Sequence, residues 1–195
     1  MLRLLRPRRR VAFVPGDTAD TLRQLPGDAK LDVVLSNHLL RYAVLPWSAA
    51  LATEDEWIAY AQHVFGSTYG AAAAGWRIRI CDGGRGHTRI ACAADAALLD
   101  AIAAVERVAS IQPHLMAAFN ARRREFGAEP GWFVLQEPGR LTLGLISGGE
   151  WKLVRNRQAP DGWRDSLNEL LHRETAASGA AACSRIVLHS GLAVA

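Results

Sequence analysis

The sequence lacks the features that mark several large classes of protein. Its 195 residues contain no apolar run near the ~18 residues of a membrane span, and residues 1–16 lack the apolar stretch of a signal peptide. The six histidines and three cysteines show neither His-x-x-x-His nor Cys-x-x-Cys spacing, and no serine lies in a Gly-x-Ser-x-Gly elbow. We therefore expect a cytoplasmic protein with no metal site and no serine hydrolase activity.

Charge is scarce away from one end of the chain. The formal net charge is +4, and five arginines lie within the first ten residues. The rest of the chain is therefore close to neutral, and we expect no nucleic acid partner. We interpret residues 1–30 as a basic tail and lead-in with a frayed, solvated terminus. An alternative is a tail that binds anionic lipid or nucleic acid.

The three cysteines are an odd number, and they lie on apolar stretches. They are Cys81, Cys92 and Cys183. This pattern predicts reduced, buried thiols and no disulfide framework.

Three β-rich runs alternate with helical patterns. The runs are Leu31–Trp47, Trp76–Ala93 and Trp132–Arg157. In the first, Asn37-His38 suits a tight hairpin turn, and in the second the glycines between the two halves permit positive φ. Pro138-Gly139 and a Gly-Gly pair divide the third run into a three-stranded meander.

Helices are predicted from capping residues and apolar periodicity. Thr53 and Glu56 form a capping box that starts a helix ending near Tyr69. Further helices are expected to begin at Asp95, Pro113 and Asp161. Arg185–His189 then reads as a short apolar strand, so the second half has the order βββαβ.

That order is the first portion of a ribonuclease-H-like fold, and two copies in tandem form the plan of actin-like ATPases. The run Val33–Trp47, whose second strand ends in Leu-Pro, resembles the cytoplasmic domain of type II secretion L proteins (GspL) and of PilM-type pilus assembly proteins. The resemblance extends over Leu31–Ala193 in the order of elements. It implies an α/β fold with two tandem ribonuclease-H-like lobes and mixed sheets. The first lobe would comprise residues 31–128 and the second, incomplete lobe residues 129–195.

The resemblance implies a non-catalytic cytoplasmic scaffold or adaptor in a type II secretion or type IV pilus-like machine. Its partners would be an assembly ATPase and inner-membrane components, with a second copy of the chain as a further alternative. Type II secretion L proteins continue into a transmembrane helix and a periplasmic domain, which this sequence lacks. We therefore expect recruitment to the inner membrane through a partner.

Nucleotide chemistry would require an Asp-x-Gly hairpin in each lobe, by the same resemblance. The first lobe has Ser36-Asn37-His38 instead, with neither carboxylate nor glycine. The second lobe keeps an acid, a glycine and a threonine. By the same resemblance, the last strand is followed by a degenerate form of the family's adenosine-binding Gly-Gly segment. The candidate nucleotide-binding residues are Glu137, Gly139, Thr142 and Gly191. We expect no turnover and no cofactor; the alternative is a nucleotide-binding actin-like ATPase or switch.

One hairpin is the candidate docking edge. Between Leu39 and Leu45 the single ionised group is Arg41, and little charge blocks strand pairing there. Trp47 follows directly, as an interface anchor or, alternatively, as part of the core. The predicted interface residues are Leu39, Arg41 and Trp47.

Overall fold

The computed structural model describes residues 8–16, 19–81, 84–180 and 183–191 of the chain. Its strands are β1 (Arg9–Val14), β2 (Lys30–Leu35), β3 (Arg41–Leu45), β4 (Trp76–Ile80), β5 (Arg89–Asp95), β6 (Val108–Pro113), β7 (Gly131–Glu137), β8 (Arg140–Ser147), β9 (Glu150–Gln158) and β10 (Ile186–Ser190). Its α-helices are α1 (Asp20–Gln24), α2 (Glu54–Tyr69), α3 (Ala96–Ala103), α4 (His114–Arg122) and α5 (Leu167–Ser178). Two short 3₁₀ helices are η1 (Gly70–Gly75) and η2 (Arg123–Glu125).

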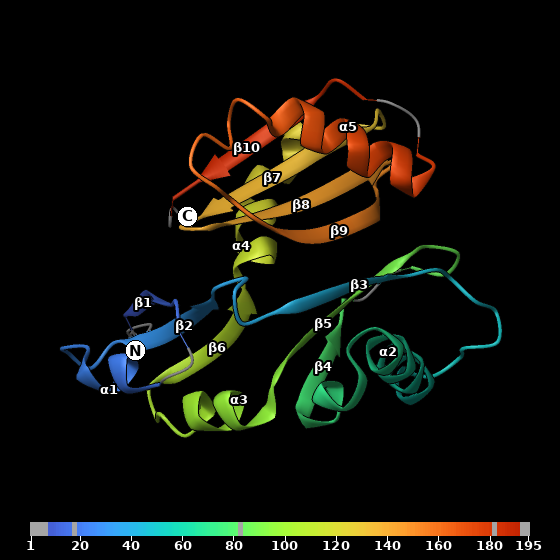
Figure 1. Cartoon of the computed structure of the whole chain (residues 1–195). Coiled ribbons are helices and arrows are strands. Elements are labelled where there is room, and N and C mark those ends of the chain that lie inside the picture. The colour runs from blue at the N-terminus through green and yellow to red at the C-terminus, as the bar shows by residue number, and fades with distance from the viewer. Residues whose placement is uncertain (1–7, 17–18, 82–83, 181–182, 192–195) are drawn as a thin grey trace, which may run out of the picture.

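Within the described residues the strands form three sheets (Figure 1). A parallel sheet has the order β1-β2-β6, and an antiparallel sheet has the order β3-β5-β4. The third sheet, β10-β7-β8-β9, is an antiparallel meander with β10 added parallel to β7. Figure 1 shows this sheet, with α5 across one face, standing over the other two. The molecule is therefore a mixed α/β structure with parallel and antiparallel sheets.

One hydrophobic core joins the parallel sheet to the four-stranded sheet. Val33 of β2 and Leu115 of α4 belong to the same buried cluster as Phe133 and Leu135 of β7. The antiparallel sheet has a separate core beneath α2, in which Trp57 is 2% exposed. The central cluster also includes residues of β3 and β5. Because it spans all three sheets, the strand ends that meet there are held in fixed positions.

Several local predictions are confirmed. Thr53 accepts a hydrogen bond from the Glu56 amide (3.3 Å), and the Glu56 carboxylate accepts from the Thr53 amide (2.8 Å), so α2 begins with the expected capping box. Asp95 caps α3 through the Leu98 amide at 3.0 Å. The β4–β5 hairpin, the meander and the final strand are present as expected.

The hairpin predicted at Leu31–Trp47 is wrong. β2 pairs in parallel with β1 and β6, whereas β3 pairs with β5 in another sheet. The consecutive buried residues Val33, Val34 and Leu35 explain the difference, because a central parallel strand is covered on both faces. Residues 36–40 therefore carry the chain from one sheet to the next.

The interpretation of the N-terminal segment as a frayed tail is wrong for the residues that the structure describes. β1 forms the edge of the parallel sheet, and Arg9 pairs with Asp32 of β2 at 2.8 Å. The apolar run Val11–Val14 was the available signal for this strand. Residues 1–7, which hold the other part of the predicted tail, lie outside the described residues.

Two predicted helices differ in their bounds. The helix capped by Asp95, which the resemblance extended to Ala109, ends at Ala103, and the unpredicted strand β6 follows it. The last helix begins at Leu167 and not at Asp161, because turns that include Gly162 at φ +72° precede it.

All three cysteines are free, but they are not all buried. Cys81 is exposed, which corrects the expectation of a buried thiol, whereas Cys92 lies on β5 and burial raises its pKa to about 12. Among the described residues, no helix is both long and apolar enough to cross a membrane.

Candidate functional site

A cavity of about 640 Å³ lies where the carboxyl ends of β1, β2, β6, β7 and β10 meet. In open α/β sheets, ligands bind beyond the carboxyl ends of the parallel strands. Its lining residues are Phe13, Pro15, Ser36, His38, His114, Gln136, Glu137, Pro138 and Gly191. The walls are largely apolar, with a small set of convergent polar groups, as is typical of a binding site.

The carboxylate of Glu137 lies at the centre of these polar groups. Its side chain is 2% exposed, and its two oxygens accept from the backbone N–H of Asn37 at 3.2 and 3.1 Å. The Nδ1 of His114 lies 3.2 Å from Oε1, at ion-pair distance but without hydrogen-bond geometry. Burial acts to raise the pKa of Glu137, but His114, Ser36 and Asn37 outweigh it and hold the pKa below its ordinary value. Glu137 is therefore ionised at neutral pH.

Asn37 connects this carboxylate to several elements, whereas the sequence predicted only a position in a turn for it. Its side-chain oxygen accepts from the Tyr42 hydroxyl at 2.6 Å and from the Leu115 amide at 3.4 Å. Its carbonyl accepts from the side-chain amide of Asn156 at 3.2 Å, and its side-chain nitrogen is buried without a partner. No sequence pattern distinguishes this asparagine from one in an ordinary turn.

Two buried histidines also face this region. His114 is fully buried without a hydrogen bond on either ring nitrogen, and the Nε2 of His189 is likewise without one. The two rings lie 6.2 Å apart, and Phe13 packs edge-on against His114 at 5.2 Å. Burial, with smaller effects from His114 and Arg122, lowers the pKa of His189. Both histidines were dismissed as metal ligands from their spacing, and no signal in the sequence placed them together.

The predicted nucleotide-binding residues do not all meet at the cavity. Glu137 and Gly191 line it, whereas Gly139 lines a different hollow beside the loop at Asp161. Thr142 lies on β8, where its hydroxyl donates to the side chain of Asn156 on β9 at 2.8 Å. The structure therefore brings together two of the four residues.

The predicted interface residues lie along and beyond β3, the edge strand of its sheet. Trp47 is 38% exposed, so the alternative of a core position is wrong. Leu39 packs against the central core, and Arg41 donates to the carbonyls of His38 and Leu40. Whether this surface binds a partner stays a prediction.

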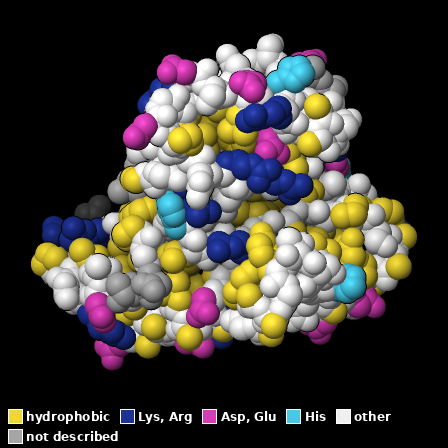
Figure 2. Space-filling model, viewed as in Figure 1, with side chains coloured by type: hydrophobic (Ala, Val, Ile, Leu, Met, Phe, Trp, Pro, Cys, Tyr) yellow, Lys and Arg dark blue, Asp and Glu magenta, His cyan; other side chains and the backbone are white. Residues whose placement is uncertain are grey.

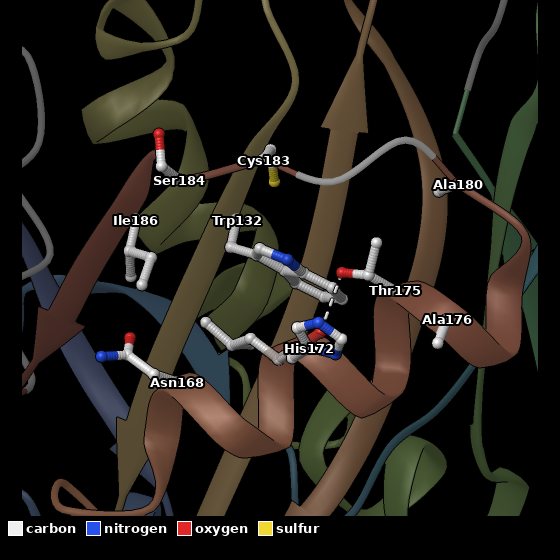
Figure 3. A pocket seen from close by; sticks show the side chains of 10 residues that line it. Trp132, Asn168, His172, Thr175, Ala176, Ala180, Cys183, Ser184 and Ile186 are labelled. Atoms are coloured by element: carbon white, nitrogen blue, oxygen red, sulfur yellow. Dashed lines mark hydrogen bonds between the residues drawn. The ribbon is translucent and has the colours of Figure 1, made fainter.

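A second hollow of about 540 Å³ lies between α5 and β10 (Figure 3). Trp132 of β7 lies at its floor, with Thr175 and His172 of α5 on one side and Ile186 of β10 on the other. The indole nitrogen of Trp132 is buried without a partner. Among the described residues that line this hollow there is no Asp, Glu, Lys or Arg, so the cavity at the strand ends is the stronger candidate site.

No group of three or more metal-ligating side chains occurs in the described part of the chain. No family model and no curated protein matches the sequence. Among solved structures, a chain of the PilM–PilN type IV pilus biogenesis complex is similar to this chain at 14% identity and a TM-score of 0.56, over 89% of this chain and 67% of that one. The cytoplasmic domain of EpsL, an inner membrane component of the type II secretion system of Vibrio cholerae, gives 13%, a TM-score of 0.55 and coverage of 89% and 65%.

A third similar structure is a Bacteroides thetaiotaomicron protein with an actin-like ATPase fold and unknown function, at 9% identity and a TM-score of 0.53. The alignment covers 83% of this chain and 59% of that one. The chain has an actin-like fold. The expected likeness to type II secretion L and PilM-type domains is confirmed at the level of the fold, and the chain spans less than two thirds of both the Vibrio and the Bacteroides structures.

Proposed function

We propose that this actin-like chain is a non-catalytic cytoplasmic adaptor in a type II secretion or type IV pilus-like assembly. One observation carries the proposal: the turn after β2 and the turn after β7 are bonded to each other. The Asn37 amide donates to Glu137, and the Nε2 of His38 donates to the carbonyl of Pro138 at 3.0 Å. By the resemblance to actin-like ATPases, these two turns would have to hold phosphate and magnesium.

The bonded turns oppose phosphate binding in three ways. The Asn37 amide is already used by a carboxylate, and Pro138 has no N–H to offer. Glu137 is ionised, and two like unit charges at about 4 Å repel by about 4 kcal/mol at an effective dielectric constant of 20. These three features favour a protein that binds other proteins and does not hydrolyse nucleotide.

The partners are proposed from the similar structures. One of them belongs to a complex of PilM with PilN, and another is an inner membrane component of a secretion system. We propose that this chain binds inner-membrane components and an assembly ATPase of such a machine, and that it reaches the membrane through them. In this proposal it comprises two tandem ribonuclease-H-like lobes that divide near residue 128.

A nucleotide-binding switch is the second candidate, and the cavity at the strand ends favours it. A volume of about 640 Å³ is within the range of ligand sites. Gly191, in the conformation φ +100°, lines that cavity beside Glu137. In this alternative, nucleotide would enter beside the bonded turns without being hydrolysed.

Titration calorimetry with ATP, with and without magnesium, separates the two proposals. For the adaptor we expect no turnover and weak, magnesium-insensitive ATP binding. We also expect the chain to form complexes with purified cytoplasmic segments of inner-membrane components, whether or not ATP is present. Turnover that disappears in Glu137→Gln would contradict the adaptor, and so would failure to bind any component of the machine. ATP binding that changes partner affinity would support the switch.

A further inference from the structure

A further polar hollow lies between the edge strands β3 and β9. Its volume is about 270 Å³. Its lining residues are Arg41, Tyr42, Tyr69, Arg140, Val154, Arg155, Asn156 and Arg157. Figure 2 shows dark blue Lys and Arg side chains gathered in the crevice between the upper and lower parts of the molecule. We call this hollow the arginine crevice.

Most of the positive charge in the arginine crevice has no carboxylate partner. Arg157 pairs with Glu174 of α5 at 2.6 Å. Arg41 and Arg155 donate only to backbone carbonyls, and the Nε of Arg140 is buried without a hydrogen bond. Across the residues that the structure describes, no ion pair forms at Arg41, Arg140 or Arg155.

The two half-buried guanidinium groups, Arg41 and Arg140, also act on each other. Burial lowers the pKa of Arg140, the charge of Arg41 lowers it further, and Glu137 opposes the change. Two like charges in a partly desolvated place destabilise a fold unless an anion lies between them. The chain nevertheless places Arg41 at the start of β3 and Arg140 at the start of β8, and both line the same hollow.

The size and shape of the hollow indicate the kind of anion. Cavities for drug-sized ligands span roughly 300–1,000 Å³, so about 270 Å³ suits a small anionic group. Guanidinium groups bind phosphate and carboxylate in a bidentate manner, and a doubly charged phosphoryl group matches two unpaired arginines. Exposed Tyr69 at the rim offers an aromatic face to whatever the phosphoryl group is attached to.

We propose that the arginine crevice binds a phosphoryl group, held between Arg41 and Arg140 with Arg155 at the rim. Such an anion joins β3 of one sheet to β8 and β9 of another, beside the hydrogen bonds that Asn156 donates to the carbonyls of Asn37 and Leu40. The site is separate from the cavity at the strand ends, since neither Arg41 nor Arg140 lines that cavity. The proposal therefore goes beyond the adaptor function and does not depend on it.

Pyrophosphate is the probe, measured by titration calorimetry on the full chain at constant ionic strength. We expect saturable binding that weakens at least tenfold in Arg41→Gln and in Arg140→Gln. Arg173→Gln is the matched control, because this arginine on α5 is 66% exposed and does not line the crevice. If Arg140→Gln does not fold, Arg41→Gln alone decides, because no donor atom of Arg41 is buried without a hydrogen bond.

Two further titrations identify the source of the phosphoryl group. Inorganic phosphate that binds as tightly as pyrophosphate supports a free anion, whereas ATP that binds more tightly, with the gain lost in Tyr69→Ala, supports the phosphoryl end of a nucleotide. Three results would overturn the proposal. They are no pyrophosphate binding at millimolar concentration, equal binding by the wild type and both crevice variants, or binding of a glutamate-rich peptide without a response to pyrophosphate.

Discussion

Removal of the Glu137 carboxylate is the perturbation whose cost can be worked out most directly. The group is 2% exposed and accepts the buried amide of Asn37 with both oxygens. A hydrogen bond to a charged group contributes roughly 1.5–3 kcal/mol, and a buried donor left unpaired costs about 1–3 kcal/mol. Glu137→Ala should therefore lower the free energy of unfolding by about 3 kcal/mol. Glu137→Gln keeps one acceptor and should cost about half as much.

Urea denaturation followed by tryptophan fluorescence measures these differences. The control is Glu169→Gln, which removes a carboxylate that is 72% exposed and pairs with Arg173 at 3.4 Å. Exposed pairs contribute about 0–1 kcal/mol. If Glu137→Ala costs no more than this control, the bonded turns do not stabilise the fold and the argument fails.

The pH dependence gives an independent check of the same group. The pKa of Glu137 in the folded protein lies below its ordinary value of 4.5. Its stabilising effect is therefore complete above about pH 5 and is lost as the pH falls through the folded pKa. The difference in the free energy of unfolding between the wild type and Glu137→Gln should shrink as the pH falls below about 5. A difference that stays constant would show that Glu137 is not ionised in the folded protein.

Further predictions concern the core, the termini and the surface. Gly144→Ala should destabilise the fold by about 1–3 kcal/mol in urea denaturation, because its Cβ would clash with the ring of Trp151. Deletion of residues 1–10 should lower the melting temperature by several degrees, because it removes the start of β1; an unchanged melting temperature would contradict that strand. Burial lowers the pKa of His189, so the contribution of the neutral ring to stability is present above about pH 6.5 and decreases on acidification. In His189→Gln the free energy of unfolding should therefore change less between pH 7.5 and 5.5. Trp47→Ala should leave the fold intact and weaken association in sedimentation, and unchanged association would remove this residue from the interface.

Elements with local signals could be predicted from the sequence. Thr53 and Asp95 are caps whose partners lie three residues away, and Gly139 and Gly148 mark turns between adjacent strands. These interactions depend on neighbours within a few positions, so the sequence contains all the information needed. The likeness to actin-like domains was predictable because the order of such elements is itself a pattern.

Pairings between distant segments could not be predicted in the same way. β2 is apolar on both faces because it lies between β1 and β6, but a hairpin strand can have the same composition. The candidate site shows the same limit. Glu137 was identified as an acid near a turn, yet its partner Asn37 lies 100 residues away and has no distinguishing neighbours. Nothing in the local sequence relates His114 to His189.

The position of Asn37 also sets the order in which the chain can be completed during synthesis. Its partners Leu115, Glu137 and Asn156 follow it by 78, 100 and 119 positions. At roughly 5–20 residues per second, Glu137 leaves the ribosome about 5–20 s after Asn37. Throughout that interval the backbone amide of Asn37 lacks the carboxylate that it bonds in the folded protein. The contact between the turns after β2 and β7 therefore forms only after most of the chain has been made.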